Sequence, residues 1–161
     1  MRLTRYTDYA MRVLLYLGAR PDRLCSIAEV AGAYGVSQNH LMKVVNDLSR
    51  AGYVATARGR FGGIRLGRDP AEINVGALVR HSEDGFELVE CGHCLIAPAC
   101  GLTGALNEAM AAFMAVLDGY TLADLLVRRA DLQALFAIPA GKESAARPGA
   151  SARRRVTAAT G

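Results

Sequence analysis

The sequence predicts a mainly α-helical (α+β) fold: a winged helix-turn-helix followed by a long C-terminal dimerisation helix. Three observations support this fold class. Short amphipathic helices flank a glycine-containing turn, a hairpin rich in glycine and arginine follows them, and an apolar stripe continues over residues 102–117. With 161 residues, the chain is long enough to bury the core of one domain and to carry an additional arm.

The first half of the sequence predicts three helices. Thr4 is the expected N-cap of a helix over residues 4–19, whose apolar residues recur at three- and four-residue steps. Ser26 and Glu29 form the pattern of a capping box, in which the glutamate side chain would reach back to the serine amide. Ser37 is the expected N-cap of a third helix that ends near Gly52.

The second and third of these helices have the spacing of a helix-turn-helix, although a helical hairpin that does not bind DNA could show the same spacing. The third helix would present side chains suited to base edges and phosphates in a major groove. These candidate DNA-contacting residues are Ser37, Gln38, Asn39, His40 and Lys43.

The next segment favours the DNA-binding reading because it predicts a wing. Residues 53–57 and 64–66 have the pattern of two short strands, and a glycine-rich turn over residues 58–63 joins them. Glycines let a backbone approach a phosphate closely, and Arg58, Arg60 and Arg65 would supply positive charge there. A nucleotide-phosphate loop is excluded, since neither a GK[ST] sequence nor a helix follows the glycines.

The charge along the chain agrees with this division of roles. Residues 1–70 carry a net charge of +6, residues 71–140 carry −6, and residues 141–161 carry +4. The basic N-terminal block indicates a polyanionic partner, and the acidic middle block cannot share that role. No apolar run reaches the roughly 18 residues of a membrane span, and no secretory signal is recognisable, so we expect a cytoplasmic protein without a membrane partner.

Three of the four cysteines lie within ten residues, as Cys91, Cys94 and Cys100 with the spacing C-x2-C-x5-C. The glycines and the proline of this segment disfavour a helix or strand and predict a compact loop. Clustered thiols in a reducing compartment indicate a metal or an iron–sulfur cluster more than a disulfide. Cys25 lies apart and is expected to be a small buried hydrophobic residue.

Two other readings of this loop concern different classes of protein. In a constitutive DNA-binding protein, Cys91, His93, Cys94 and Cys100 would hold a structural zinc ion. A thiol oxidoreductase would use the C-G-H-C sequence, but that motif normally opens a helix in a βαβ unit, which is not predicted here. With no catalytic triad, acid pair or cofactor loop elsewhere, we expect no enzymatic activity.

The second half of the sequence predicts a dimerisation helix. Its apolar face is broader than one small domain needs to cover, so we expect burial against a second copy in a C2 dimer, with an intrachain core as the alternative. Thr121 and Asp124 predict the start of a last short helix. The candidate dimerisation residues are Leu106, Met110, Phe113, Met114 and Leu117.

These patterns divide the chain into four parts. Residues 1–82 form the DNA-binding domain, and residues 83–101 form the cysteine loop. Residues 102–139 form the dimerisation helix and a C-terminal helix. Residues 140–161 are expected to be a disordered tail, in which three consecutive arginines add only nonspecific affinity for DNA.

Several segments resemble the Rrf-type winged-helix regulators. They are residues 1–10, Val36–Leu41, Leu48–Val54 and Arg58–Leu66. Cys94–Cys100 and Leu117–Leu125 are similar to one group in that family, the nitric-oxide-sensitive repressors of the NsrR type. The resemblance covers roughly residues 1–136.

The resemblance implies an iron–sulfur cluster, either [2Fe-2S] or [4Fe-4S], held by Cys91, Cys94 and Cys100 of one subunit and Asp8 of the other. From the residues alone, Asp8 would be only a favourable charge near the start of a helix. The resemblance further implies a homodimeric repressor that releases palindromic operator DNA when nitric oxide attacks the cluster. An iron-responsive regulator of the RirA type, in which cluster loss is the signal, is the alternative within the family.

The cysteine spacing departs from the family pattern. Family members usually separate the first two cysteines by four or more residues, whereas only Gly92 and His93 intervene here. The short loop places His93 where it could replace a cysteine ligand. Cluster-assembly regulators of the family carry a histidine three positions after the third cysteine, and this position is Thr103 here, which does not support their ligand set.

Overall fold

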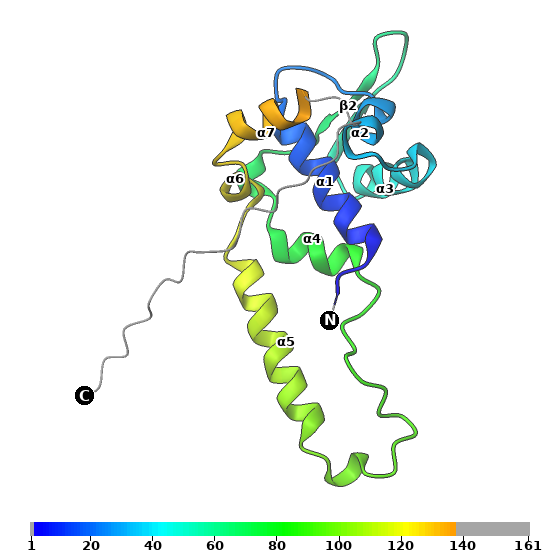
Figure 1. Cartoon of the computed structure of the whole chain (residues 1–161), viewed down its shortest axis with the longest axis vertical. Helices are drawn as coiled ribbons and strands as arrows, with labels where there is room; N and C mark the ends of the chain where they lie inside the picture. Colours follow the sequence, from blue (N-terminus) through cyan, green and yellow to red (C-terminus); the bar gives the residue numbers. More distant parts are fainter. Residues whose placement is uncertain (1, 138–161) are drawn as a thin grey trace, which may run out of the picture.

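The computed structural model describes residues 2–137, so the tail predicted at 140–161 lies outside the described residues. Figure 1 shows a body of helices and an arm that projects from it, in which α5 runs beside the segment of residues 83–101. In chain order the elements are α1 (Arg5–Ala19), α2 (Ile27–Tyr34), α3 (Gln38–Arg50), β1 (Val54–Ala57), β2 (Gly63–Leu66), η1 (Pro70–Glu72), α4 (Val75–Ser82), η2 (Ala97–Ala99), α5 (Leu102–Asp118), α6 (Leu122–Leu125) and α7 (Arg129–Ala137). The winged helix-turn-helix and the long helix are therefore present as predicted. No helix within residues 2–137 is both long enough and apolar enough to cross a membrane.

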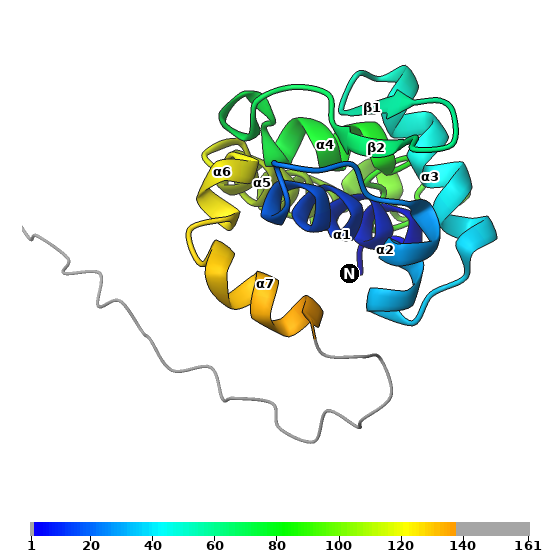
Figure 2. The ribbon, with the colours of Figure 1, turned by 90° about the horizontal axis from the view of Figure 1, so that it is seen from above.

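Helix α1 is the centre of the body, and the other helices surround it (Figure 2). Its predicted N-cap is confirmed, because the Thr4 hydroxyl accepts a hydrogen bond from the Thr7 amide at 3.2 Å. Val13 and Leu14 on this helix are fully buried, in agreement with the predicted apolar face. Burying a Val or Leu side chain contributes about 1.5–3 kcal/mol, so α1 organises most of the core.

The start of α2 confirms only half of the predicted capping box. The Ser26 hydroxyl accepts from the Glu29 amide at 3.1 Å, as expected. The Glu29 carboxylate accepts from the Tyr16 hydroxyl at 2.7 Å and binds Arg23, and the Ser26 backbone is the smallest of the causes that lower its pKa. The Arg23 guanidinium is the main cause that lowers the pKa of Glu29 to about 2. Arg23 and Tyr16 therefore affect this carboxylate more than Ser26, its predicted local partner, does.

The wing is an antiparallel hairpin in which Val54 pairs with Leu66 and Ala57 pairs with Gly63. Cys25 adds a third, single-residue bridge: its amide donates to Ile64 O at 2.9 Å, and the Ile64 amide donates back at 2.8 Å. The Cys25 side chain is 1% exposed, which confirms the prediction of a buried hydrophobic residue, and burial raises the pKa of its thiol. The segment before α2 therefore fastens the wing to the body.

Helices α6 and α7 return to the body instead of following α5. Leu122 and Leu126 are buried there, and Leu126 packs so closely over Gly18 that a Cβ on that glycine would lie 2.5 Å from it. After the predicted short helix the structure has a further helix, α7, and the centre of its Phe136 ring lies 4.8 Å from that of Tyr16. The core around α1 therefore includes residues from both ends of the described chain.

The C-terminal end of α5 is clamped to α4. The Arg80 guanidinium donates two hydrogen bonds of 2.6 Å to the Asp118 carboxylate and is the main cause that lowers its pKa. The Asn74 side chain caps α4 by accepting from the Ala77 amide and donates to Asp118 O at 2.7 Å. Gly76 faces this clamp, since a Cβ there would lie 2.0 Å from Asp118 Oδ1.

We expect Gly76→Ala to lower the free energy of unfolding by about 2 kcal/mol, because the added methyl displaces Asp118 from Arg80. Gly32→Ala is the matched control: Gly32 is also helical, and a Cβ there meets nothing within 4 Å. The control should be neutral or gain up to about 1 kcal/mol from its helix propensity. Urea unfolding of both variants measures the difference, and equal effects would contradict the clamp.

Candidate DNA-binding surface and cysteine loop

The turn between α2 and α3 presents the start of α3 at the surface. Gly35 ends α2 with a φ of +63°, a left-handed conformation that glycine adopts without a Cβ clash. Ser37 occupies the N-cap position of α3 as predicted, but its side chain makes no capping hydrogen bond within the described chain. All five predicted DNA-contacting residues of this helix are exposed: Ser37, Gln38, Asn39, His40 and Lys43.

The wing presents the three predicted arginines to solvent. Arg58 and Arg60 lie in the turn, Arg65 lies on β2, and all three are exposed. Gly62 is required for the tight turn, since a Cβ there would lie 2.3 Å from Ala57 O. The wing extends from the end of the body that lies opposite the tip of the arm (Figure 1). The arrangement offers cationic side chains beside the exposed start of a helix, which suits phosphate contacts.

Arg68 is a structural residue of this surface that the sequence did not reveal. Its guanidinium donates to Ala51 O at 2.6 Å and to Gly52 O at 3.1 Å, and it lies 4.6 Å from the centre of the Tyr53 ring. A cation at these carbonyls caps the C-terminal end of α3 and offsets the negative end of the helix dipole. No local pattern predicts it, because 16 residues separate Arg68 from Gly52.

The cysteine loop is a chain of tight turns. The Cys94 amide donates to Cys91 O at 3.2 Å, the Ala97 amide donates to Cys94 O at 3.1 Å, and the Cys100 amide donates to Ala97 O at 3.3 Å. Residues 86–89, which precede these turns, form neither a helix nor a strand. All three thiols are free, with Cys94 exposed and Cys91 and Cys100 half-buried.

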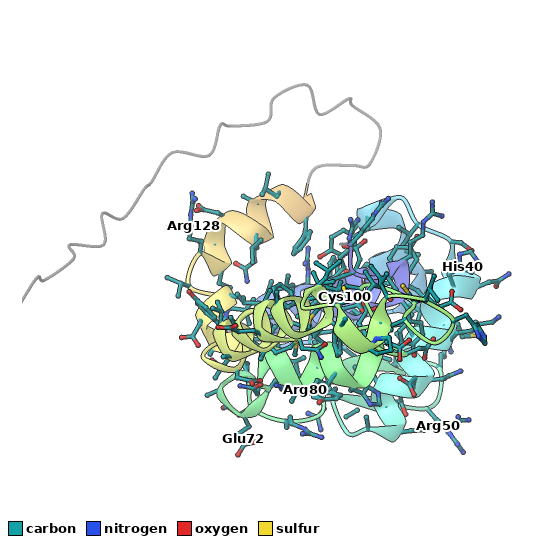
Figure 3. All side chains as sticks on the ribbon, turned by 90° about the horizontal axis from the view of Figure 1, so that it is seen from below. His40, Arg50, Glu72, Arg80, Cys100 and Arg128 are labelled. Carbon is teal, nitrogen blue, oxygen red and sulfur yellow. The ribbon has the colours of Figure 1, made fainter. Side chains whose placement is uncertain are left out.

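Cys91 faces α5 across a cavity of about 430 Å³ between the loop and that helix. Its sulfur lies 3.4 Å from the Thr103 hydroxyl oxygen, and Leu106 lines the same cavity. In Figure 3, which views the molecule from the arm, Cys100 lies in front of the body and His40 lies at its side. The cysteine loop and the start of α3 are therefore separate regions of a single chain.

One chain does not assemble the predicted ligand set. Within residues 2–137, no three His, Cys, Asp or Glu side chains are grouped closely enough to hold a metal ion. Asp8 lies in the first turn of α1 and accepts a hydrogen bond from Arg12 Nε at 2.9 Å. His93 is exposed on the loop. The proposed ligation by Asp8 thus requires a second subunit and the closing of the loop.

The predicted dimerisation face is incompletely covered within one chain. Leu106, Met110, Phe113 and Leu117 remain half-buried, whereas Met114 is only 7% exposed because α4 packs against this end of α5. Met114 thus belongs to the intrachain contact, which leaves the other four side chains as the partly open face.

Comparison with known proteins agrees with this architecture. Residues 3–128 match the family described as Rrf2, iron-dependent transcriptional regulators. The HTH-type transcriptional regulator NsrR of Bacillus subtilis is 52% identical over 142 residues, which cover 84% of this chain and 97% of that protein.

Two solved structures have the same fold. A putative transcriptional regulator from Listeria innocua superposes with a TM-score of 0.68 at 30% identity, over 78% of this chain and 86% of that one. IscR of T. potens has a TM-score of 0.67 at 24% identity, over 83% of this chain and 91% of that one. The chain therefore belongs to the Rrf2 family, and it is an NsrR-like DNA-binding transcriptional regulator and not an enzyme.

Proposed function

We propose that the protein is a homodimeric repressor whose operator binding depends on an iron–sulfur cluster and is abolished by nitric oxide. The observation that carries the proposal is the set of three free thiols on the loop of the arm, in a chain 52% identical to an NsrR protein. The exposed residues of α3 and the wing would read the operator, and α5 would pair the two subunits.

The residues present fit a cluster in kind and number. Cys91, Cys94 and Cys100 supply soft thiolates, which iron–sulfur clusters prefer. The loop bonds between Cys91 and Cys100 are local turns, so its closure around a group would not break a larger sheet or helix. A fourth ligand must come from outside this set, and Asp8 of the second subunit is the candidate.

A cluster held by Cys91, Cys94 and Cys100 would supply iron with which nitric oxide can react. On the protein side, Cys91, Cys94 and Cys100 would hold the loop closed, and Asp8 would tie that loop to α1 of the second subunit. Release of these side chains would free both connections. The recognition helices, which must stand about 34–36 Å apart to read successive major grooves, would then lose their spacing.

The test uses protein purified without oxygen and an operator duplex that this protein selects from a random pool. We expect absorbance between about 300 and 450 nm and at least about tenfold weaker operator binding after nitric oxide, a change of about 1.4 kcal/mol. Colourless protein that contains zinc would support the structural zinc site instead. Release of DNA by an iron chelator but not by nitric oxide would support the iron-responsive alternative.

A further inference from the structure

The cysteine loop begins directly after the C-terminal end of α4. Three consecutive side chains in the last turn of α4 contact three different helices. Arg80 binds Asp118 at the end of α5, as described above. The His81 ring Nε2 lies 2.8 Å from Asp47 Oδ2 of α3. The Ser82 hydroxyl donates to the Thr7 hydroxyl of α1 at 2.9 Å. The last turn of α4 thus contacts α5 of the arm, α3 and the central helix α1.

The next residue attaches the loop itself. The Glu83 carboxylate accepts hydrogen bonds from the amide and the hydroxyl of Thr4, at 2.7 and 3.1 Å. Thr4 is the N-cap of α1, so the first residue of the cysteine loop is fastened to the helix that carries Asp8. Because Glu83 directly follows Ser82, a movement of Glu83 would also move the last turn of α4.

Asp47 lies one helical turn after Lys43 on α3, close to the C-terminal end of that helix. A carboxylate there is unfavourable for the helix dipole, so its partners determine whether it is tolerated. Besides His81, Asp47 accepts a hydrogen bond from Tyr6 of α1, and burial followed by this bond raises the pKa of that tyrosine to about 12. The carboxylate joins α3 to both α1 and α4.

The contact is partly protected from solvent. The His81 and Asp47 side chains are 32% and 38% exposed, and the centre of the His81 ring lies 5.8 Å from that of Tyr53. Among the three consecutive contacts of residues 80–82, only that of His81 reaches α3. This hydrogen bond links α3 to the last turn of α4, from which the loop begins.

We infer that His81 is a positioning residue that acts through Asp47 to align the recognition helix with the base of the cysteine loop. The inference rests on the proposed function for the signal that arrives at the loop. It adds a physical connection between the loop and α3. A shift of Glu83 moves the last turn of α4, and the His81–Asp47 hydrogen bond transmits this movement to α3.

A double-mutant cycle tests the inference in the cluster-loaded full chain. His81→Ala and Asp47→Ala should each weaken binding to the selected operator by about fivefold, and the double variant should be no weaker than either single one. Binding to a non-operator duplex of the same length should change less than twofold, because that binding depends on contacts between basic side chains and phosphates, which neither substitution removes, rather than on helix alignment. His81→Gln should restore most of the affinity, since its amide can donate to Asp47.

Arg128→Ala is the matched control, because Arg128 and Asp131 form an exposed ion pair far from α3 in sequence, and it should change neither affinity. Additive losses in the double variant, equal losses on both duplexes, or no rescue by glutamine would each overturn the inference. The mutant cycle is measured without nitric oxide. If nitric oxide does not change the operator affinity of the wild-type protein, that result refutes the proposed function and leaves the inference about His81 standing. If His81→Ala does not fold, the operator affinities of His81→Gln and Asp47→Ala still test the inference: the first should stay close to that of the wild type and the second should be about fivefold weaker.

Discussion

Cys94→Ala is expected to remove the visible absorbance of anaerobically purified protein and to abolish the effect of nitric oxide on DNA binding. Cys94 is exposed, so the substitution removes a thiol without opening a cavity in the core. With two thiols left on the loop, the proposed cluster loses a required ligand. Operator affinity should fall at least about tenfold, to the value of the cluster-free wild type.

Cys25→Ala is the control for this experiment. Cys25 is the fourth cysteine, but it is 1% exposed and held between α1 and the wing, so its loss should lower stability and leave the absorbance unchanged. Absorbance spectra, iron content and fluorescence anisotropy with labelled operator measure the outcome. A Cys94→Ala protein that still responded to nitric oxide as the wild type does would end the case for this thiol as a ligand.

Phe113→Asp is expected to convert the protein to a monomer. Phe113 lies near the middle of the half-buried face of α5, and a carboxylate buried there against a second copy would have no partner. The dimer dissociation constant should rise about 100-fold or more, and operator binding should fall with it, since one subunit reads only half of a palindrome. Sedimentation velocity and anisotropy measure the two effects.

Ala111→Asp adds the same charge to the same helix on another side. Ala111 is exposed, and two residues of α-helix rotate it by about 200° from Phe113. This variant should remain a dimer with unchanged operator affinity. If both variants stayed dimeric, the apolar stripe of α5 would not be the dimer interface.

The predicted fold was confirmed where the signals are local. Thr4 and Thr121 cap their helices as expected, and the Asp124 carboxylate completes the capping box of α6 by accepting from the Thr121 amide at 2.7 Å. The two strands of the hairpin and the exposure of the wing arginines also agree with the sequence. Such features depend on residues that lie a few positions apart, so they can be predicted from a single sequence.

The sequence was less informative where partners are distant. No local pattern reveals that His81 lies 2.8 Å from Asp47, because 34 residues separate the two. The sequence also placed Met114 in the dimer face, and this side chain is already only 7% exposed within one chain. Ligation by the cysteines and Asp8 stays a prediction, because it requires a group and a second subunit.

By itself, the sequence determined the helices of the DNA-binding domain and the long helix of the arm, which turn carries the wing, and that three thiols share one loop. Hydrophobic periodicity, capping residues and glycine positions decide these features within one or two helical turns. Only the tertiary structure decided that the last turn of α4 contacts α1, α3 and α5 through three consecutive residues. The angles at which helices pack on the core set such contacts, and no local pattern in the chain encodes them.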